Sequence, residues 1–293
     1  MPKKKCVFII NPISGIGKQK NLPALIRQYL DTNQFEYEII FTRYPAHATE
    51  LGEEYKGKVD SIVAVGGDGT INETASALLG TDTALGIIPL GSGNGFARHL
   101  HISTNPVRAI KQLNSAKKLP LDVGFLNDHP FFNVSGTGFD ALISKKFARQ
   151  ARRGYATYIR CVWEEISVYQ PRSYRYKLND KVVEEKFFFI AFANSEQYGN
   201  NAIIAPQAKT NDGLLDIVMV RPFPQSYLVT FTLLAYTRMI HLSPYVEMFQ
   251  TEHFELQQLN DPLVHIDGEY VETDEHKLDI SLRPQNLQVL KPL

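Results

Sequence analysis

Up to Val123, the chain alternates between short apolar runs and longer stretches that are compatible with helices. The apolar runs lack polar alternation, which is typical of strands buried on both faces of a parallel sheet. The predicted strands are Lys5–Ile10, Tyr37–Phe41, Ser61–Val65, Ala84–Ile88 and Leu119–Val123. The predicted helices are Leu22–Leu30, Ala46–Tyr55, Ile71–Leu79, a helix opening near Phe96, and Val107–Leu113. This alternation predicts a doubly wound α/β domain.

Beyond residue 128 the pattern changes to short β-rich segments separated by turn residues. The predicted strands include Phe131–Val134, Ser173–Leu178, Phe187–Ala193, Leu215–Val220 and Phe254–Leu259, with two closing strands at His276–Leu282 and Leu287–Leu290. Such a series predicts an antiparallel sandwich or barrel. We therefore expect a first domain over residues 1–128 and a second over 129–279, with residues 280–293 free to return to the first.

Composition narrows the class of protein. The chain has 31 basic and 31 acidic residues, so no overall field draws it to nucleic acid. Two cysteines, Cys6 and Cys161, are too few for a disulfide framework and fit a reducing compartment. The first apolar run stops at Asn11-Pro12, too early for a signal peptide, and Leu228–Ile240 carries three threonines and Arg238, unlike a membrane span. A soluble cytoplasmic protein is expected.

Three glycine-bearing loops, at Asn11, Gly66 and Gly91, follow three predicted strands. Open α/β sheets bind ligands along that edge. The central loop, Gly66-Gly67-Asp68-Gly69-Thr70, leads directly into a predicted helix, whose first N–H groups and dipole favour an anion. Asp68 in such a site indicates a magnesium ion carried with a nucleotide. The alternative is a tight turn with Asp68 or Thr70 as N-cap.

Two common nucleotide motifs are excluded. The run Asn11–Lys18 lacks the glycine spacing of a Walker A loop, and Gln19 stands where that loop has serine or threonine. The run Gly91–Gly95 does not match the dinucleotide fingerprint, so a nicotinamide-dependent oxidoreductase loses support.

A longer series of motifs runs through the chain in order. Its members are Asn11-Pro12-x-Ser14-Gly15, Thr42, Gly66–Thr70, Pro89-x-Gly91-Ser92-Gly93-Asn94, Gly138-Phe139-Asp140, Ala205-Pro206, Asp212-Gly213-x-Leu215-Asp216 and Asp267-Gly268-Glu269. This series resembles the diacylglycerol kinase catalytic-domain superfamily of lipid kinases, which includes soluble bacterial diacylglycerol kinases and sphingosine kinases. The first domain would then be NAD kinase- or phosphofructokinase-like, since those enzymes share the Gly66–Thr70 element or a close variant.

The resemblance implies ATP- and Mg²⁺-dependent phosphorylation of a lipid hydroxyl, with the nucleotide between the two domains. The residues that would contact the nucleotide are Asn11, Pro12, Ser14, Gly15, Thr42, Gly66, Gly67, Asp68, Gly69, Thr70, Asn72 and Ser92. Asp68 would also be catalytic. Glu269 would be the general base, supported by Asp122 and Asp267. A structural magnesium would be held by Asp212 and the backbone carbonyls of Lys209 and Leu214.

The residues themselves add an argument about the base. Asp267 and Glu269 lie two apart, so on an extended segment they would share one face. Two nearby carboxylates raise one another's pKa, which would make Glu269 a better base. The alternative for Asp267–Glu269 is a plain β-turn between strands, and for Asp212-Gly213 it is a hairpin turn.

The acceptor stays open. Bacterial diacylglycerol kinases usually have an acidic residue where this chain has Gly95, and the preceding motif is closer to sphingosine kinases. Diacylglycerol, a long-chain base and another lipid alcohol are all open. The rival functions are a soluble-metabolite kinase related to NAD kinase and a catalytically silent binding module. If the protein were a catalytically silent module, we would expect Asp68 or Glu269 to be replaced, and both are present.

A basic segment offers a contact with lipid. It consists of Lys145, Lys146, Arg149, Arg152 and Arg153, in a run compatible with a helix. Five charges against an anionic leaflet contribute about 1 kcal/mol each. We expect peripheral membrane association through this segment, the alternative being a solvated helix face. An exposed strand edge in the second domain is a candidate surface for a homodimer.

Overall fold

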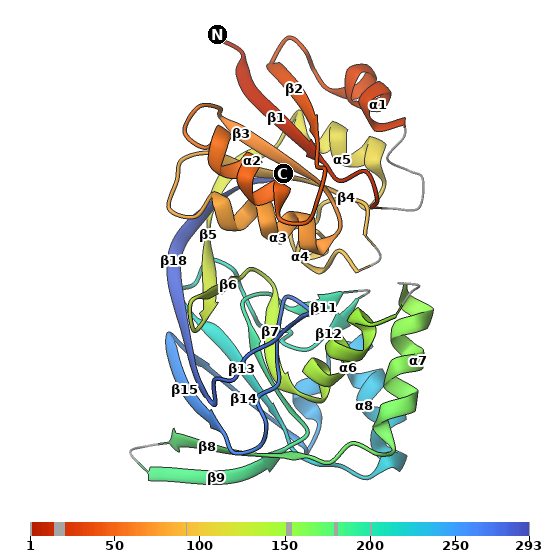
Figure 1. The fold of residues 1–293 in the computed structure, drawn as a ribbon, viewed down its shortest axis with the longest axis vertical. Helices are drawn as coiled ribbons and strands as arrows, with labels where there is room; N and C mark the ends of the chain where they lie inside the picture. Colours follow the sequence, from red (N-terminus) through yellow and green to blue (C-terminus); the bar gives the residue numbers. More distant parts are fainter. Residues whose placement is uncertain are drawn as a thin grey trace. The chain divides into compact units, whose positions relative to one another are not determined.

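The computed structural model describes residues 2–14, 21–91, 93–150, 154–178, 181–199 and 201–292 (Figure 1). The chain forms two compact units. Unit 1 comprises Met1–Asp122 with Pro284–Leu293, and unit 2 comprises Val123–Arg283. Two strands, β5 (Lys117–Leu126) and β18 (Lys277–Lys291), contain residues of both units.

Unit 1 is built on a parallel sheet in the order β2-β1-β3-β4-β18. The first four strands are β1 (Lys4–Ile10), β2 (Phe35–Phe41), β3 (Ser61–Gly66) and β4 (Ala84–Pro89). Every residue of β3 and β4 is buried, which explains why these strands are continuous apolar runs.

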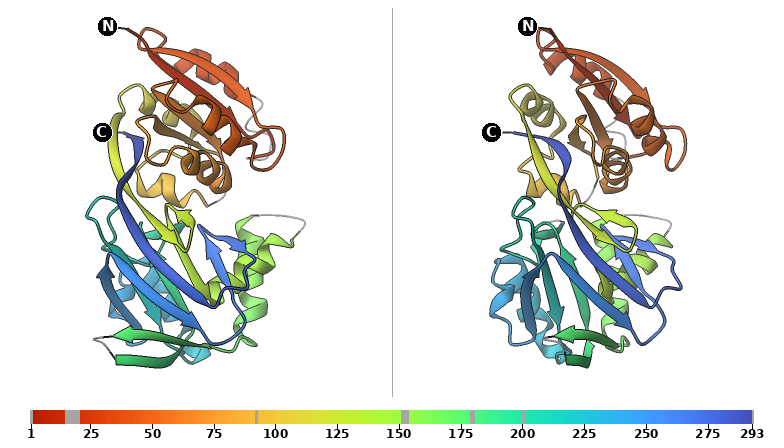
Figure 2. Two further views of the ribbon diagram at one scale, coloured as in Figure 1. Left: turned by 60° about the vertical axis from the view of Figure 1, so that its left-hand side comes forward. Right: turned by 90° about the vertical axis from the view of Figure 1, so that its left-hand side faces the viewer.

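The helices of unit 1 cover both faces of this sheet. They are α1 (Leu22–Tyr29), α2 (His47–Tyr55), α3 (Asp68–Ala77), α4 (Gly95–His99) and α5 (Pro106–Leu113). Helix α2 packs on α3 and α1 packs on α5, one pair on each face of the sheet (Figure 2). The predicted doubly wound α/β domain is confirmed.

One local prediction for unit 1 is wrong. The helix expected at Ile71–Leu79 begins at Asp68, and its N-cap is Gly67, without a side-chain cap. Neither Asp68 nor Thr70 is therefore the N-cap. Gly67 has an extended backbone, so the chain turns into the helix there and the Asp68 carboxylate is available for a contact outside the helix.

Unit 2 is a sandwich of two mainly antiparallel sheets. One has the order β18-β15-β8-β9, with β5 and β6 alongside; its strands are β6 (His129–Phe131), β8 (Arg172–Leu178), β9 (Lys181–Phe187) and β15 (His253–Gln258). The other has the order β14-β13-β10-β7-β16-β17. Its strands are β7 (Val134–Gly138), β10 (Phe189–Ala193), β13 (Leu215–Val220), β14 (Val246–Thr251), β16 (Val264–Ile266) and β17 (Glu269–Val271). A core containing Phe131, Phe187 and Phe192 joins the two sheets, which confirms the predicted β-sandwich.

Three helices add a second core to unit 2. They are α6 (Phe139–Ala148), α7 (Tyr155–Ile166) and α8 (Leu228–Tyr236), accompanied by a short pair of strands, β11 (Gln197–Gly199) and β12 (Ala202–Ile203). Their apolar side chains pack with Phe188 and Phe189 beside the six-stranded sheet. Among the residues described, no helix has the length and apolar character needed to cross a membrane.

The two closing strands expected at His276–Leu282 and Leu287–Leu290 are one strand, β18. Pro284 lies inside it, where it cannot donate to the ladder, and Gln285 has a positive φ of 52°. The Gln285 N–H instead donates to the Oδ1 of Asp122 at 2.8 Å. The Asp122 side chain thus takes the place of a strand partner at Gln285, which lies in the gap that the sequence predicted between two strands.

Candidate active site

In unit 1, the loops after β1 and β3 are joined through Asn11 and Thr70. The Asn11 N–H donates to the Val65 carbonyl at 3.0 Å, and its Nδ2 donates to the Thr70 Oγ1 at 3.1 Å. A Cβ on Gly66 would lie 2.5 Å from the same Thr70 oxygen. Glycine at 66 is therefore required for Thr70 to be buried beside Asn11.

The loops after β3 and β4 touch each other. A Cβ on Gly91 would lie 2.9 Å from the Cα of Gly67, and a Cβ on Gly93 would lie 3.0 Å from the Oδ2 of Asp68. That same oxygen accepts the backbone N–H of Asn94 at 2.9 Å. The predicted phosphate loop and the loop that follows the next strand thus form one structure at the carboxyl edge of the sheet.

Asn94 supplies a test of whether this edge fits a ligand. It has a positive φ of 52°, and its Nδ2 donates to the Gly91 carbonyl at 2.7 Å. Its Oδ1 is buried and has no hydrogen-bond partner within the part of the chain that the structure describes. A buried acceptor without a donor favours a bound molecule that brings a hydroxyl, an N–H or a metal ion. Together with the α3 N-terminus, the residues present fit a nucleotide with its cation.

The other predicted nucleotide contacts follow the same strands. Thr42 comes directly after β2, is largely buried, and donates its N–H to the Ile10 carbonyl at 2.9 Å. Pro12 and Ser14 follow β1, and Gly69 and Asn72 lie in α3. Gly15 and Ser92 lie outside the described residues. The structure therefore brings the described members of this set to the ends of β1, β2 and β3.

In unit 2, the Asp267-Gly268 pair forms the turn between β16 and β17. Both residues have positive φ, 48° and 85°, and Ile266 pairs with Glu269 across the turn. This is the geometry of a two-residue hairpin with a type I′ turn. The expectation that Asp267 and Glu269 share one face of an extended segment is wrong, because the chain reverses direction between them. This reversal also removes the basis for expecting the two carboxylates to raise one another's pKa.

The Asp267 side chain binds the turn to the loop between β6 and β7. Its Oδ2 accepts the Phe132 N–H at 3.0 Å, and its Oδ1 accepts the Asn133 N–H at 2.8 Å. Asp122 is likewise engaged, since it is buried and accepts the Gln285 N–H. That either aspartate supports Glu269 during the reaction stays a prediction.

Two of the three predicted magnesium residues line a polar pocket of unit 2 with a volume of about 470 Å³, and the third, Leu214, does not. Lys209 and Asp212 line it, together with Glu196, Pro206, Gln207, Ala208, Arg238 and Gln250. The Leu214 N–H donates to the Asp212 Oδ1 at 3.2 Å, which closes the Asp212-Gly213 turn. Arg238 is paired with Glu196 at 2.8 Å, so its charge is compensated. The Asp212 carboxylate supplies an oxygen of the kind that Mg²⁺ prefers, and a magnesium site here stays a prediction.

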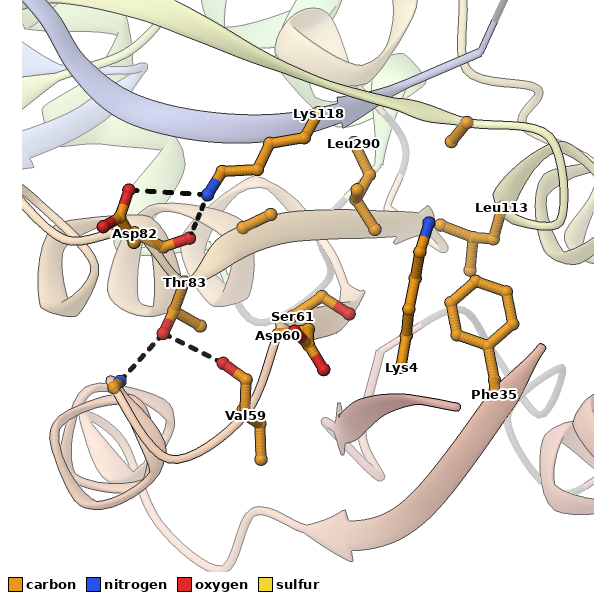
Figure 3. Close-up of a pocket in the computed structure, with 13 residues that line it drawn as sticks. Lys4, Phe35, Val59, Asp60, Ser61, Asp82, Thr83, Leu113, Lys118 and Leu290 are labelled. Carbon is orange, nitrogen blue, oxygen red and sulfur yellow. Dashed lines mark hydrogen bonds and ion pairs between the residues drawn. The ribbon is translucent and has the colours of Figure 1, made fainter. Parts of the chain in front are cut away.

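A second pocket, of about 390 Å³, lies in unit 1 at the amino ends of the parallel strands (Figure 3). Lys118 donates to the Asp82 carbonyl at its rim, and Thr83 Oγ1 is bonded to Gly57 and Val59. None of the predicted site residues lines this pocket. It is thus at the opposite ends of the strands from the glycine loops.

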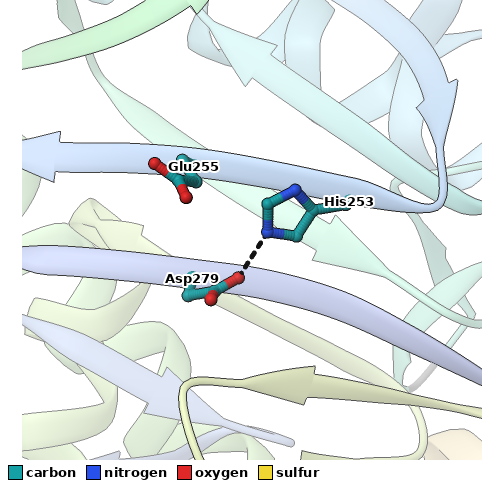
Figure 4. Close-up of side chains that lie close together, drawn as sticks. All are labelled: His253, Glu255 and Asp279. Atoms are coloured by element: carbon teal, nitrogen blue, oxygen red, sulfur yellow. Dashed lines mark hydrogen bonds and ion pairs between the residues drawn. The ribbon is translucent and has the colours of Figure 1, made fainter.

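One cluster of possible metal ligands was not predicted from the sequence. His253, Glu255 and Asp279 come together on β15 and β18, with ligand atoms within 4.8 Å of one another (Figure 4). All three are exposed; His253 bonds Asp279 at 2.7 Å, and Lys277 pairs with Glu255 at 3.2 Å. Cross-strand register alone made this cluster, so linear spacing gave no signal. Lys277 compensates the charge of Glu255, and nothing else among the described residues indicates an ion here.

The basic segment does not form the single helix that was expected. Helix α6 ends at Ala148, with Arg149 as its C-cap, and Arg152 and Arg153 lie outside the described residues. Lys146 is paired with Glu165 of α7, and the Lys145 Nζ lies 4.8 Å from the ring centroid of Tyr270. The run is therefore not one continuous helix, because α6 stops before Arg149; contact of the segment with lipid stays a prediction.

Comparison with known proteins agrees with this arrangement. Residues 5–126 match the family described as the diacylglycerol kinase catalytic domain, and residues 133–291 match the YegS C-terminal NAD kinase β-sandwich-like domain. Two solved structures from Bacillus anthracis str. Sterne share the fold. One, of a diacylglycerol kinase, has a TM-score of 0.77 at 21% identity and covers 99% of this chain and 98% of that chain. The other has a TM-score of 0.81 at 23% identity, covering 98% and 95%.

Curated relatives are closer in sequence. A diacylglycerol kinase of Mycobacterium tuberculosis (strain ATCC 25618 / H37Rv) is 30% identical over 252 residues, which cover 80% of this chain and 77% of that protein. A "Probable lipid kinase YegS-like" of Chromohalobacter salexigens is 34% identical over 187 residues, which cover 62% of this chain. The match spans 58% of that relative, which is less than two thirds of its length. With both units matched, the chain belongs to the family of lipid kinases that carry the diacylglycerol kinase catalytic domain.

Proposed function

We propose that this protein transfers the γ-phosphoryl group of ATP, in the presence of Mg²⁺, to a hydroxyl of a diacylglycerol- or sphingoid-type lipid. The observation that carries the proposal is the contact between the two glycine loops. Gly67 and Gly91 leave no side chains between the loops, and Asp68 at the start of α3 is tied to Asn94. Backbone N–H groups, a helix N-terminus and a carboxylate for a cation are what a nucleotide with its cation requires.

In this proposal the two units divide the work. Unit 1 binds the phosphates through the first turn of α3, and Asp68 orients the cation that neutralises their charge. Unit 2 supplies Glu269, which accepts the proton of the lipid hydroxyl. As it does so, the hydroxyl oxygen bonds to the γ-phosphorus, and the bond between that phosphorus and the leaving ADP breaks. Positioning and charge neutralisation carry most of the catalysis in phosphoryl transfer, and the conformationally restricted turn before Glu269 suits that demand.

The acceptor is proposed to be met at a membrane surface. Arg149 is exposed and ends α6, and further along unit 2 the segment 228–242 carries exposed apolar side chains without a single Asp or Glu: Val229, Leu233, Tyr236, Met239 and Leu242. Exposed apolar side chains without acidic neighbours in the segment suit insertion into a bilayer surface, and an exposed arginine suits an anionic one.

The test is a transfer assay with labelled ATP, Mg²⁺ and a panel of acceptors: diacylglycerol, sphingosine, ceramide, monoacylglycerol and NAD. The variants are Glu269→Gln and Asp68→Asn, with Asp128→Asn, an exposed carboxylate of the β5–β6 turn, as a control. Transfer to one lipid, lost in the first two variants and kept in the third, supports the proposal. Transfer to NAD, or no transfer to any acceptor, overturns it in favour of a soluble-metabolite kinase or a silent module.

A further inference from the structure

A buried polar network lies beneath the turn that carries Glu269. His265 of β16 is 1% exposed. Its Nδ1 accepts the backbone N–H of Gly268 at 3.1 Å, and its Nε2 lies 3.0 Å from the Oδ2 of Asp140. Because Nδ1 accepts a hydrogen bond, the ring proton resides on Nε2 and is donated to Asp140. His265 therefore links the Gly268 amide to the partly buried carboxylate of Asp140.

Asp140 is fixed from several sides. It occupies the first turn of α6, where the helix dipole favours a negative charge, and its Oδ1 accepts the Ala141 N–H at 2.8 Å. Its Oδ2 also accepts the hydroxyl of Tyr198 at 2.8 Å. Burial raises the pKa of Tyr198 well above its ordinary value, and the Asp140 charge raises it further, so the phenol stays a donor. The carboxylate that orients His265 is thus itself immobilised.

Strand β7 leaves room for this pair. Gly136 lies opposite His265 in the sheet. A Cβ at this position would lie 2.6 Å from the Ile190 carbonyl, 2.8 Å from the Asp140 Oδ2 and 3.2 Å from the His265 Nε2. Any larger residue would enter the space between the carboxylate and the ring. The sequence of β7 is therefore fitted to the network.

We propose that His265 is a positioning residue for Glu269, and that Tyr198 and Asp140 hold it in place. The turn is anchored at Asp267 by the Phe132 and Asn133 amides and at Gly268 by the His265 Nδ1. With both residues of the turn in the positive-φ region, the hydrogen bond to the Gly268 N–H fixes the Asp267–Gly268 peptide, one residue before Glu269. This inference rests on the proposed role of Glu269 as proton acceptor.

Two substitutions separate the two hydrogen bonds of the ring. In His265→Asn the amide oxygen replaces Nδ1 and still accepts from Gly268, whereas in His265→Gln the amide nitrogen replaces Nε2 and still donates to Asp140. We expect His265→Gln to lower kcat about tenfold with an unchanged KM for ATP, the effect of one lost hydrogen bond. His265→Asn should retain kcat within about threefold. Tyr198→Phe should give a smaller loss, and the exposed His253→Asn none.

Amide hydrogen exchange at Gly268 gives a readout that does not depend on activity. Its protection should fall in His265→Gln and persist in His265→Asn, while both variants melt at similar temperatures. Equal kcat and equal Gly268 protection in the two variants would overturn the role of His265. If instead Glu269→Gln retains activity while the exchange pattern is as expected, the base assignment fails and the network stands, so the two failures are distinguishable.

Discussion

The backbone N–H of Asn94 donates to the Asp68 carboxylate at 2.9 Å and so joins the loops that follow two adjacent parallel strands. The Asp68 side chain lies at the positive end of α3, and the same side chain holds the neighbouring loop through the Asn94 N–H. Asp68 is thus both a structural link and the proposed cation ligand.

Asp68→Asn separates these two tasks, because the amide oxygen can still accept from Asn94 but carries no charge. We expect kcat/KM to fall about a hundredfold or more, as for loss of an electrostatic group at a reacting centre. The unfolding temperature should change little. Asp82→Asn, at an exposed carboxylate of the same unit, is the control. A variant with normal kcat/KM would remove Asp68 from the reaction.

Gly91→Ala tests the contact between the loops. The new Cβ would meet the Cα of Gly67 at 2.9 Å, and backbone atoms cannot move aside cheaply. We expect urea unfolding to show a loss of about 1–3 kcal/mol, and ATP affinity to fall with it. The comparison is Gly67→Ala, whose Cβ would be at an ordinary 3.6 Å from Gly91. Equal losses in both variants would contradict the predicted close contact.

Magnesium added without nucleotide should raise the unfolding temperature if the pocket around Asp212 binds it. A ligand at a hundred times its dissociation constant stabilises a protein by about 2.7 kcal/mol. The increase should disappear in Asp212→Asn. It should persist in His253→Ala, which disrupts the exposed His253, Glu255 and Asp279 cluster. The reverse pattern would move the ion to that cluster.

Asp216 gives a pH-dependent prediction. Burial raises its pKa, and the charge of Asp212 adds to the shift, against a hydrogen bond from Gln250 that lowers it. A raised folded-state pKa means that the stability contributed by the protonated form is present at low pH and is lost as pH rises through the shifted pKa. Asp216→Asn should therefore be more stable than wild type at pH 7, and the difference should shrink as pH falls through the raised pKa and disappear below the ordinary aspartate value of about 4. A constant difference in unfolding free energy across this range would contradict the shift.

Vesicle sedimentation tests the basic segment. Replacing Arg149, Arg152 and Arg153 with Gln should weaken binding to anionic vesicles by well over tenfold, at about 1 kcal/mol for each charge. Neutral vesicles should show no difference. The matched variant replaces three exposed lysines of the β8–β9 pair, Lys177, Lys181 and Lys186, and so makes the same change in net charge. Equal effects of the two triple variants would mean that overall charge, and not this segment, determines binding.

The sequence predicted most of unit 1 because strands buried on both faces leave uninterrupted apolar runs, as in Ser61–Val65. It also indicated the edge where Asp68 and Thr70 lie, since parallel strands place their carboxyl ends together. The error at Asp267 and Glu269 came from reading a spacing of two as extended chain, although Asp-Gly is a strong signal for a tight hairpin turn.

Other features had no linear signal. His265 and Tyr198 join Asp140 only through sheet register and the packing of α6, and an isolated histidine in a strand resembles an ordinary core residue. Asp140 was the one visible member, through the motif Gly138-Phe139-Asp140. The break between α6 and α7 had one signal, Gly154, which lies directly before α7 and has a positive φ; this residue was given no weight in the prediction.

The last strand, β18, has a consequence for how the chain folds during synthesis. Unit 1 ends at Asp122 and resumes at Pro284, where Val289 pairs with Leu85 of β4. Until the ribosome has delivered the whole of Val123–Arg283, β4 has an unpaired edge, and such edges recruit other chains. Unit 1 therefore completes its sheet only after the residues of the sandwich have been made, and the pairing of β4 with β18, far apart in sequence, should slow folding.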